Sequence, residues 1–261
     1  MREEIDRIRQ AMGRSGKSYE IIVVDDGSTD GSAAELDGVL GIRVIRFASN
    51  RGSGTARRYG SMAARGTVVV WTDVDMTYPN DRIPELVAAL DGHYQVVGAR
   101  RTEEGTLKFF RRPAKWLIRR LASYLAGVRI PDLNSGFRAF RRDVGTQFLY
   151  LLPRGFSCVT TLTMTFLTNG YSVHYIPIEY AARRGDSKFH WWSDTRKFLL
   201  QVVRMTLSYE PLRVFGPPAA LLGIMGIGKL VYDLVDKNFR VGTNTLVVMG
   251  VAGLLALIGL I

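Results

Sequence analysis

The residues in this sequence best suited to chemistry are two acidic pairs, each placed directly after a short apolar run. Asp25 and Asp26 follow one run of Ile and Val, and Asp73 and Asp75 follow another. Such runs predict buried strands, and Asp is also common in the turns that end strands. Carboxylate oxygens bind Mg²⁺ and Mn²⁺, and phosphate oxygens and water commonly complete the coordination of these ions. For Asp73 and Asp75, the residues alone leave both an ordinary turn and a cation site open.

The charge balance favours an anionic partner. The 261-residue chain has 35 Lys and Arg against 24 Asp and Glu, a formal charge of +11. Nucleic acid, phospholipid headgroups and phosphorylated small molecules are ordinary partners of such a protein. Arginines are concentrated at 100–142 and 183–213, where guanidinium groups could bind phosphates through paired hydrogen bonds. The single cysteine, Cys158, excludes a disulfide framework and a cysteine-rich metal site, and its apolar neighbours predict a small core residue.

The elements that must position the acids alternate between strands and helices. Short apolar runs predict strands, and the segments between them predict helices. This alternation is typical of an α/β fold with a mainly parallel sheet, in which ligands bind at the carboxyl ends of the strands. Both acidic pairs stand at such ends, so we expect them to form one shared site. The strands are expected within residues 19–26, 42–47, 67–75 and 94–100.

After Arg213 the composition becomes apolar, and two segments have the character of membrane helices. About 20 apolar residues cross a hydrocarbon core of roughly 30 Å. Residues 214–234 meet that length, with Lys229 and Asp233 near the far end, where they can reach the interface, and 245–261 is at the short end of the range. The short linker predicts an antiparallel hairpin. A buried helical hairpin in a soluble protein is the alternative.

The distribution of basic residues predicts the orientation of this hairpin. The segment 183–213 before the first helix is strongly basic, whereas the linker between the helices has only Lys237 and Arg240. By the positive-inside rule, the large N-terminal domain is expected on the cytoplasmic side of a multi-pass cell-membrane protein. Residues 195–207 have helical apolar spacing, which predicts either an amphipathic helix on the bilayer surface or a helix covering the domain's own sheet.

Five short motifs occur in the order seen in glycosyltransferase family 2. They are YEIIVVDDGSTDGS, NRGSGTARRYGSMAARG, VVVWTDVD, NSGFRAFRRD and RRGDSK. In them the chain most resembles the polyprenyl-phosphate glycosyltransferases, the group of dolichol-phosphate mannose synthase and undecaprenyl-phosphate glucosyltransferase. Each motif is weak alone, whereas five in order over residues 1–213 are specific. The C-terminal hairpin is similar to that of the group's bacterial members.

The resemblance implies a GT-A fold, which is a nucleotide-binding α/β domain, and an inverting transfer of a sugar. The donor would be a UDP- or GDP-sugar, the acceptor a polyprenyl phosphate at the cytoplasmic face of the lipid bilayer, and the cofactor Mg²⁺ or Mn²⁺. The expected parts are 1–182 for the GT-A domain, 183–213 for a basic loop and interfacial helix, and 214–234 and 245–261 for the membrane helices.

Two other interpretations stay open beside the leading one. The first is a non-catalytic membrane scaffold derived from such an enzyme, and the second is a transferase with a non-lipid acceptor. Nucleic acid is not expected as a partner, because the chain carries membrane spans and no known nucleic-acid module. The oligomeric state is open, including a homo-oligomer.

The resemblance also implies roles for particular residues. Asp75 would ligate the metal, with Asp73 near the ribose and the same ion, and both are expected to be catalytic. A catalytic basic loop would close over the donor diphosphate and limit hydrolysis of the donor. The remaining residues follow the family's motifs: Asp25, Asp26, Gly27, Ser28 and Arg100 for the nucleotide-sugar; Arg111, Arg112, Ser135 and Arg138 for the acceptor phosphate; Arg183, Arg184 and Lys188 for the loop.

The chain departs from the family's pattern in two places. Members normally begin with a strand resembling V-x-I-P-x-Y-N-E, but here Met1 leads directly into what resembles the first helix. Loss of a central strand would leave inner strand edges unpaired, which conflicts with a well-packed sheet, so a start site placed too far downstream is favoured. Dolichol-phosphate mannose synthases often carry Gln two residues after the metal Asp. This chain has Thr77 there, so mannose does not follow from the resemblance.

Overall fold

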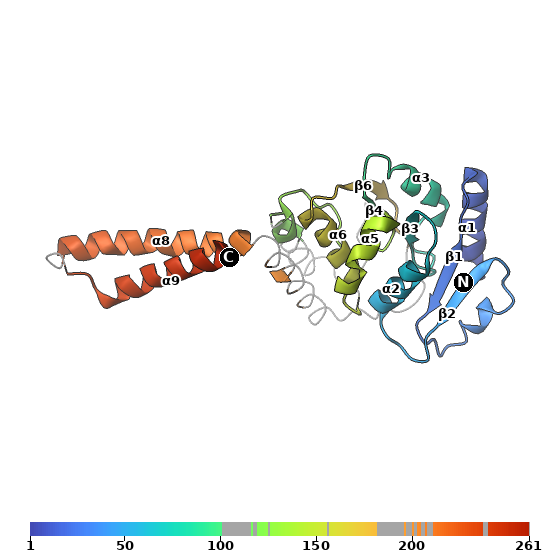
Figure 1. The fold of residues 1–261 in the computed structure, drawn as a ribbon, viewed down its shortest axis with the longest axis horizontal. Coiled ribbons are helices and arrows are strands. Elements are labelled where there is room, and N and C mark those ends of the chain that lie inside the picture. Colours follow the sequence, from blue (N-terminus) through green and yellow to red (C-terminus); the bar gives the residue numbers. More distant parts are fainter. Residues whose placement is uncertain are drawn as a thin grey trace.

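The structure is a computed structural model of the chain, and Figure 1 shows a mixed α/β domain from which two long C-terminal helices extend side by side. The helix α1 (Arg2–Ser15) and the strands β1 (Ile21–Asp25) and β2 (Ile42–Arg46) lie at the end of the domain opposite the two long helices (Figure 1). The structure describes residues 1–100, 116, 119–124, 126–155, 157–181, 196, 200, 203–204, 207, 211–236 and 240–260. Most of the predicted helix at 195–207 lies outside them.

The first helix follows from local sequence signals. α1 carries Glu3 and Glu4 in its first turn and Arg14 in its last, an arrangement that interacts favourably with the helix dipole. It ends at Gly16, whose φ of 66° is the left-handed conformation that glycine adopts without strain. β1 and β2 then pair in parallel, as the alternating pattern predicts.

The second sheet has four strands in the order β3-β5-β4-β6. β4 and β6 run parallel, whereas β5 lies between β3 and β4 and runs antiparallel to both. The α/β fold with parallel strand pairs is confirmed. The antiparallel β5 is a difference, because its segment is too short and too rich in arginine to predict a strand. The bounds are Val68–Trp71 (β3), Gln95–Arg100 (β4), Arg138–Arg141 (β5) and Val173–Ile178 (β6).

The two sheets are not joined through strand hydrogen bonds in the described part of the chain. β1 pairs with β2 alone, and β3 pairs with β5 alone. Every residue of β1 is only half-buried, although four of the five are Ile or Val. Among the described residues, neither β1 nor β3 pairs with a further strand on its other edge.

Helices cover the four-stranded sheet and enclose its core. One group of buried side chains packs Leu86 of α3 against Phe137 and the sheet, and a second packs Trp71 and Phe140 against α6. Cys158 at the start of α6 is fully buried in the second group, which confirms its prediction as a core residue. The bounds are Ala34–Leu36 (η1), Ser53–Ala63 (α2), Asn80–Arg82 (η2), Ile83–Ala88 (α3), Arg142–Gly145 (α5), Thr146–Leu151 (η3) and Cys158–Thr168 (α6).

The two C-terminal helices, α8 (Pro211–Asp236) and α9 (Thr243–Leu260), form a hairpin (Figure 1). Their mean hydropathies are 1.6 and 2.0, and only 11% and 17% of their most apolar stretches are buried within the protein. Length, composition and this exposed apolar surface suit membrane association better than a soluble core. The two predicted apolar helices are present. Pro217 and Pro218 lie inside α8.

At the linker end of the hairpin, the two helices are joined by Asp233, whose side chain is fully buried. Its Oδ2 accepts hydrogen bonds from the backbone N–H of Gly242 at 2.8 Å and from the hydroxyl of Thr245. Asp233 of α8 therefore caps the amino end of α9, where free N–H groups and the helix dipole favour a carboxylate. The sequence predicts that this side chain reaches toward the interface, and the structure instead turns it inward.

Replacing Asp233 by Ala is expected to lower the melting temperature of the detergent-solubilised protein by about 2–6 °C, because loss of a capping side chain costs about 1–1.5 kcal/mol. Circular dichroism during heating measures this change. Asp236→Ala is the matched control, because it removes the same charge from an exposed position on the same helix. Equal melting temperatures for the two variants would contradict the capping role.

Candidate active site

The loop after β3 holds Asp73 in contact with a buried arginine. Arg57 of α2 donates from Nη2 to Asp73 Oδ1 at 2.8 Å, and the two side chains are 13% and 41% exposed. Burial alone would lower the pKa of the Arg57 guanidinium, but the Asp73 carboxylate outweighs it, so the pKa of Arg57 is raised. Arg57 is therefore a fixed cation that directs one oxygen of Asp73 and leaves the rest of the carboxylate accessible.

Asp75 lies in a tight turn two residues further along the loop. Its Oδ1 accepts a hydrogen bond from the backbone N–H of Thr77 at 3.3 Å and another from the Thr77 hydroxyl. Met76 between them has a φ of 64°, a left-handed conformation that is uncommon for a residue with a side chain. Such strained turns gather at functional sites, where surrounding contacts hold them. Asp75 thus has the contacts of a turn residue in addition to any role as a ligand.

A buried network of polar side chains also holds this loop. Asn80 donates from Nδ2 to the backbone carbonyl of Asp73 at 3.5 Å and to the carboxylate of Glu4. Thr72 donates its hydroxyl hydrogen to the Asn80 side-chain oxygen. Asn80 and Glu4 are both fully buried, so these contacts are shielded from water. Helix α1, which the sequence does not link to the site, therefore helps to fix the acidic loop.

The NSGFR segment packs against this loop at Gly136. The backbone N–H of Gly136 donates to the Tyr78 hydroxyl at 2.7 Å. A Cβ at position 136 would lie 2.8 Å from Arg57 Nη2 and 3.3 Å from Asp73 Oδ2, so only glycine fits without displacing the ion pair. Burial, with the nearby Asp73 charge, raises the pKa of Tyr78 to about 12, which keeps this hydroxyl neutral. Two motifs far apart in the sequence thus form one site.

Two residues predicted to bind the acceptor phosphate, Ser135 and Arg138, are fully buried. The Arg138 guanidinium donates to the carbonyl oxygens of Ser135 and Val159 and to the hydroxyl of Thr163, the last two at 2.6 and 2.9 Å. Burial, together with the neighbouring Arg57 charge, lowers the pKa of Arg138 to about 10. Its guanidinium carbon lies 5.9 Å from the centre of the Trp71 ring at the end of β3. Its contact with a phosphate stays a prediction, and it would require Arg138 to leave these acceptors.

Arg100 at the end of β4 forms a two-point ion pair that the sequence does not predict. Its Nε and Nη2 donate to the two carboxylate oxygens of Asp132 at 2.7 and 3.0 Å. Asp132 also accepts from the backbone N–H of Asn134 at 2.8 Å. The guanidinium lies 5.3 Å from the centre of the Tyr180 ring. The predicted contact between Arg100 and the donor stays a prediction, with most of the guanidinium already committed to Asp132.

The first acidic pair is bonded to the backbone of its own surroundings. Asp25 Oδ1 accepts from the N–H of Ser28 at 3.0 Å. Asp26 accepts from the N–H groups of Arg51 and Gly52 at 2.7 and 2.9 Å, just before α2. Gly27 has a φ of 72°, and a Cβ there would lie 2.6 Å from the backbone of the facing segment, so glycine is required.

Helix α2 links the two acidic pairs. Its amino end is bonded to Asp26, and Arg57 on the same helix is bonded to Asp73. One acid of each pair, Asp26 and Asp73, is therefore bonded to the same helix, and the shared site stays a prediction. Their roles in nucleotide binding stay predictions. The predictions for five further residues fall outside the described part of the chain: Arg111, Arg112, Arg183, Arg184 and Lys188.

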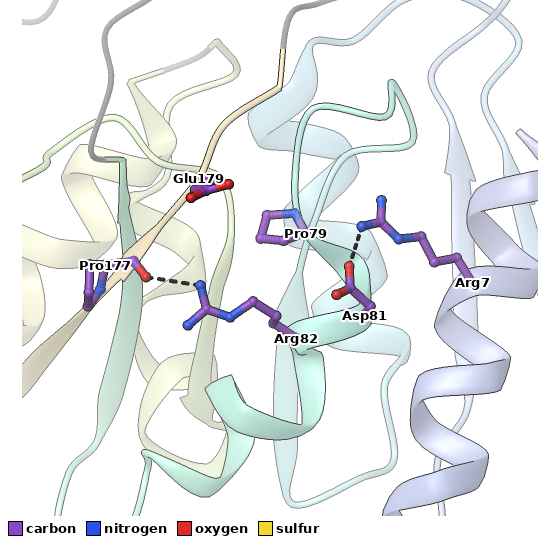
Figure 2. Close-up of a pocket in the computed structure, with 6 residues that line it drawn as sticks. All are labelled: Arg7, Pro79, Asp81, Arg82, Pro177 and Glu179. Atoms are coloured by element: carbon purple, nitrogen blue, oxygen red, sulfur yellow. Dashed lines mark hydrogen bonds and ion pairs between the residues drawn. The ribbon is translucent and has the colours of Figure 1, made fainter.

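A cavity of about 330 Å³ lies near the acidic loop, but its charges already neutralise one another (Figure 2). Arg7 of α1 pairs with Asp81, and Arg82 donates to the carbonyl oxygen of Pro177 at 3.0 Å. Glu179 adds a second acid to the lining. With two arginines facing two acids, this cavity has no excess positive charge for a diphosphate.

A larger cavity, about 980 Å³, opens beside Arg100 and is strongly basic. It lies next to the start of α8, because Arg213 of that helix donates to the Tyr124 carbonyl oxygen at 3.4 Å. Cationic and aromatic side chains together suit an anionic group attached to an apolar chain. The residues of this basic cavity that carry those groups are Arg100, Trp116, Arg119, Arg120, Tyr124 and Arg129.

The acidic loop fits a divalent cation in chemistry, provided that other ligands complete the coordination. Asp73 and Asp75 supply hard oxygen atoms, which Mg²⁺ and Mn²⁺ prefer. Within the described ranges, no three side chains of His, Cys, Asp or Glu form a group that could hold a metal. An ion in this position would therefore draw most of its ligands from phosphate oxygens and water.

Comparisons with known proteins give both a family and a fold. The family model described as glycosyl transferase family 2 matches residues 2–146. Undecaprenyl-phosphate 4-deoxy-4-formamido-L-arabinose transferase of Enterobacter sp. (strain 638) is 34% identical over 232 residues, which cover 85% of this chain and 68% of that relative. The protein with the same description from Edwardsiella ictaluri (strain 93-146) is 33% identical over 230 residues, 85% of this chain and 69% of the relative.

Solved structures agree with the fold. Glucosyl-3-phosphoglycerate synthase from Mycobacterium tuberculosis in complex with UDP superposes with a TM-score of 0.61 at 20% identity, covering 78% of this chain and 75% of that one. The complex of the same enzyme with Mn²⁺, UDP and phosphoglyceric acid has a TM-score of 0.62 at 21% identity, with 78% and 74% covered. At these identities the likeness establishes the GT-A fold alone.

Proposed function

This chain belongs to glycosyltransferase family 2, and from that premise we propose that it transfers a sugar from a nucleotide-sugar to a polyprenyl phosphate at the cytoplasmic face of a membrane. The observation that carries the acceptor is the basic cavity beside Arg100, which lies next to the first helix of the hairpin. A polyprenyl phosphate combines an anionic head with an apolar chain, and this cavity offers arginines and aromatic rings at the membrane end of the domain. The names of the curated relatives support the same acceptor.

The proposed sugar transfer depends more on positioning the reactants and neutralising charge than on proton transfer. The attacking oxygen of a lipid phosphate is already anionic, so a strong general base is not needed. The domain must instead hold donor and acceptor in line and stabilise the leaving diphosphate. A divalent cation held by Asp75, with Asp73 beside it, would neutralise part of that diphosphate charge. Arg183, Arg184 and Lys188 are proposed to close over the donor and exclude water.

The donor and the metal are proposed from the relatives and the loop together. UDP is the first nucleotide to test, because the structures that share the fold hold UDP and Mn²⁺. The relatives' names make 4-deoxy-4-formamido-L-arabinose the first sugar to test. Mannose is not favoured as the sugar, because this chain has Thr77 where mannose synthases often carry Gln. Thr77 is 1% exposed and bonded to Asp75 within the loop. Mn²⁺ and Mg²⁺ are both compatible with the two carboxylates.

The test supplies purified protein in detergent with labelled UDP- and GDP-sugars, polyprenyl phosphate and either metal. We expect label in the organic phase with a UDP-sugar, and only when polyprenyl phosphate is present. Labelled product that forms equally well without the lipid would support the non-lipid acceptor instead. An absence of any labelled product across the donor series would favour the non-catalytic scaffold.

A further inference from the structure

We propose that Arg57 is a positioning residue, which holds Asp73 in the orientation that a divalent cation and its nucleoside diphosphate require. This inference rests on the proposed function, because it assumes that the acidic loop receives a metal–diphosphate donor. Arg57 lies in the GTARR stretch of α2, and it is not among the residues to which the family resemblance gives a role. The proposal comes from four contacts of its side chain.

The guanidinium of Arg57 is enclosed on several sides by different elements. Nη2 donates to Asp73 Oδ1 at 2.8 Å, and Nη1 lies 3.6 Å from the sulfur of Cys158 on α6. The guanidinium carbon is 5.6 Å from the centre of the Trp71 ring at the end of β3. Only 13% of the side chain is exposed. A planar cation held by a strand, a helix and a loop has one orientation, so the carboxylate that it binds is oriented as well.

Gly136 completes this enclosure from the remaining side. A methyl group at position 136 would stand 2.8 Å from Arg57 Nη2, closer than a carbon atom is normally found. The same methyl would stand 3.3 Å from Asp73 Oδ2. The backbone of Gly136 therefore packs close to the ion pair, and a side chain at this position would press on both partners.

The ion pair engages Oδ1 of Asp73 and leaves 41% of that side chain exposed. A carboxylate fixed through one oxygen presents its other oxygen in a constant direction, which is the role of residues that orient metal ligands. Arg57 repels a bare divalent cation. However, the complex of a divalent cation with a nucleoside diphosphate has a net negative charge, so the guanidinium attracts that complex. Positioning and charge therefore act in the same direction for the metal-bound donor.

The experiment measures Mn²⁺ binding in the presence of saturating UDP, using the electron paramagnetic resonance signal of free Mn²⁺. Arg57→Gln is expected to weaken binding by about 10- to 100-fold, the usual effect of losing a residue that orients a metal ligand. Arg57→Lys keeps the positive charge but lacks the planar guanidinium with its several N–H donors. It should therefore recover part of the lost Mn²⁺ affinity. Arg58→Gln removes a neighbouring positive charge from the same helix and should leave the affinity unchanged.

Unchanged Mn²⁺ affinity in folded Arg57→Gln would overturn the proposal, even if that variant melts at a lower temperature. Melting curves recorded for each variant separate the two effects, since a purely structural role lowers the melting temperature and leaves the affinity of the folded fraction intact. Failure of the wild-type protein to bind Mn²⁺ with UDP would also overturn it. The measurement needs no acceptor, so a failure to glycosylate polyprenyl phosphate would count against the proposed function and leave the Arg57 result standing.

Discussion

Asp75→Ala is expected to lower the rate of sugar transfer by about two to three powers of ten while leaving the protein folded. The reason is that this carboxylate is proposed to hold the cation that neutralises the leaving diphosphate, a contribution made chiefly as negative charge develops there. Initial rates over a series of Mn²⁺ and Mg²⁺ concentrations measure the effect. Asp81→Ala is the control, because Asp81 is in the same region but is paired with Arg7.

A second substitution at the same position separates the ligand role from the turn role. Asp75 accepts hydrogen bonds from Thr77, and Asn can accept the same bonds without carrying a charge. Asp75→Asn should therefore preserve the turn and be about as inactive as Asp75→Ala. An Asp75→Asn variant with nearly full rates would show that the residue serves the turn alone. Full wild-type rates in excess chelator would contradict the metal as well.

The fold was predictable where it depends on short-range signals. Apolar runs of Ile and Val after Tyr19 and after Gly66 are strands, and the mostly apolar stretch after Arg213 forms two long helices. β5 was not predictable in this way, because Arg138 and Arg141 make its segment polar. Its strand conformation comes from pairing with β3 and β4 on both sides, which is a tertiary effect that overrides local preference.

The candidate site was predictable for its acids and less so for the groups that hold them. Asp73 and Asp75 stand out because they directly follow an apolar strand within a motif that resembles one of the family's. Arg57 is one of two adjacent arginines, and the sequence does not say which of them faces the loop. In the sequence, Asn80 has no feature that links it to the site. Only the structure shows its hydrogen bond to Glu4, which is far away in the sequence. Partners of this kind depend on packing between elements, which short motifs do not contain.

Breaking the ion pair between Arg100 and Asp132 is expected to lower the stability of the folded protein strongly. Its side chains are 27% and 11% exposed, and Asp132 takes two hydrogen bonds from the guanidinium. Removing one partner of a buried pair leaves a charge without compensation and costs about 3–5 kcal/mol. Because Arg100 keeps some contact with solvent, we take about 3 kcal/mol, a fall in melting temperature of about 6–12 °C for Arg100→Leu.

The double variant Arg100→Leu with Asp132→Asn distinguishes an uncompensated charge from lost packing. Asn keeps an oxygen that can accept from the Asn134 N–H, and it carries no charge. Replacing both partners of a buried pair is often close to neutral, so the double variant should recover most of the lost stability. If the double variant melts at or below the temperature of Arg100→Leu, the destabilisation comes from packing and not from the charge of Asp132.

The dependence of this loss on pH provides an independent check with a definite sign. Burial alone would raise the pKa of Asp132, but the hydrogen bonds and charge of Arg100 outweigh it and hold that pKa below its ordinary value. A lowered carboxyl pKa stabilises the folded wild-type protein above the ordinary value of about 3.9, and this stabilisation disappears as the pH falls through the lowered pKa. Without Arg100 the folded-state pKa rises. The difference in melting temperature between wild type and Arg100→Leu should therefore be largest near pH 7 and shrink as the pH falls below about 4, through the lowered pKa of Asp132. A difference that stays constant over this range would mean that Arg100 stabilises the fold through contacts other than the Asp132 carboxylate.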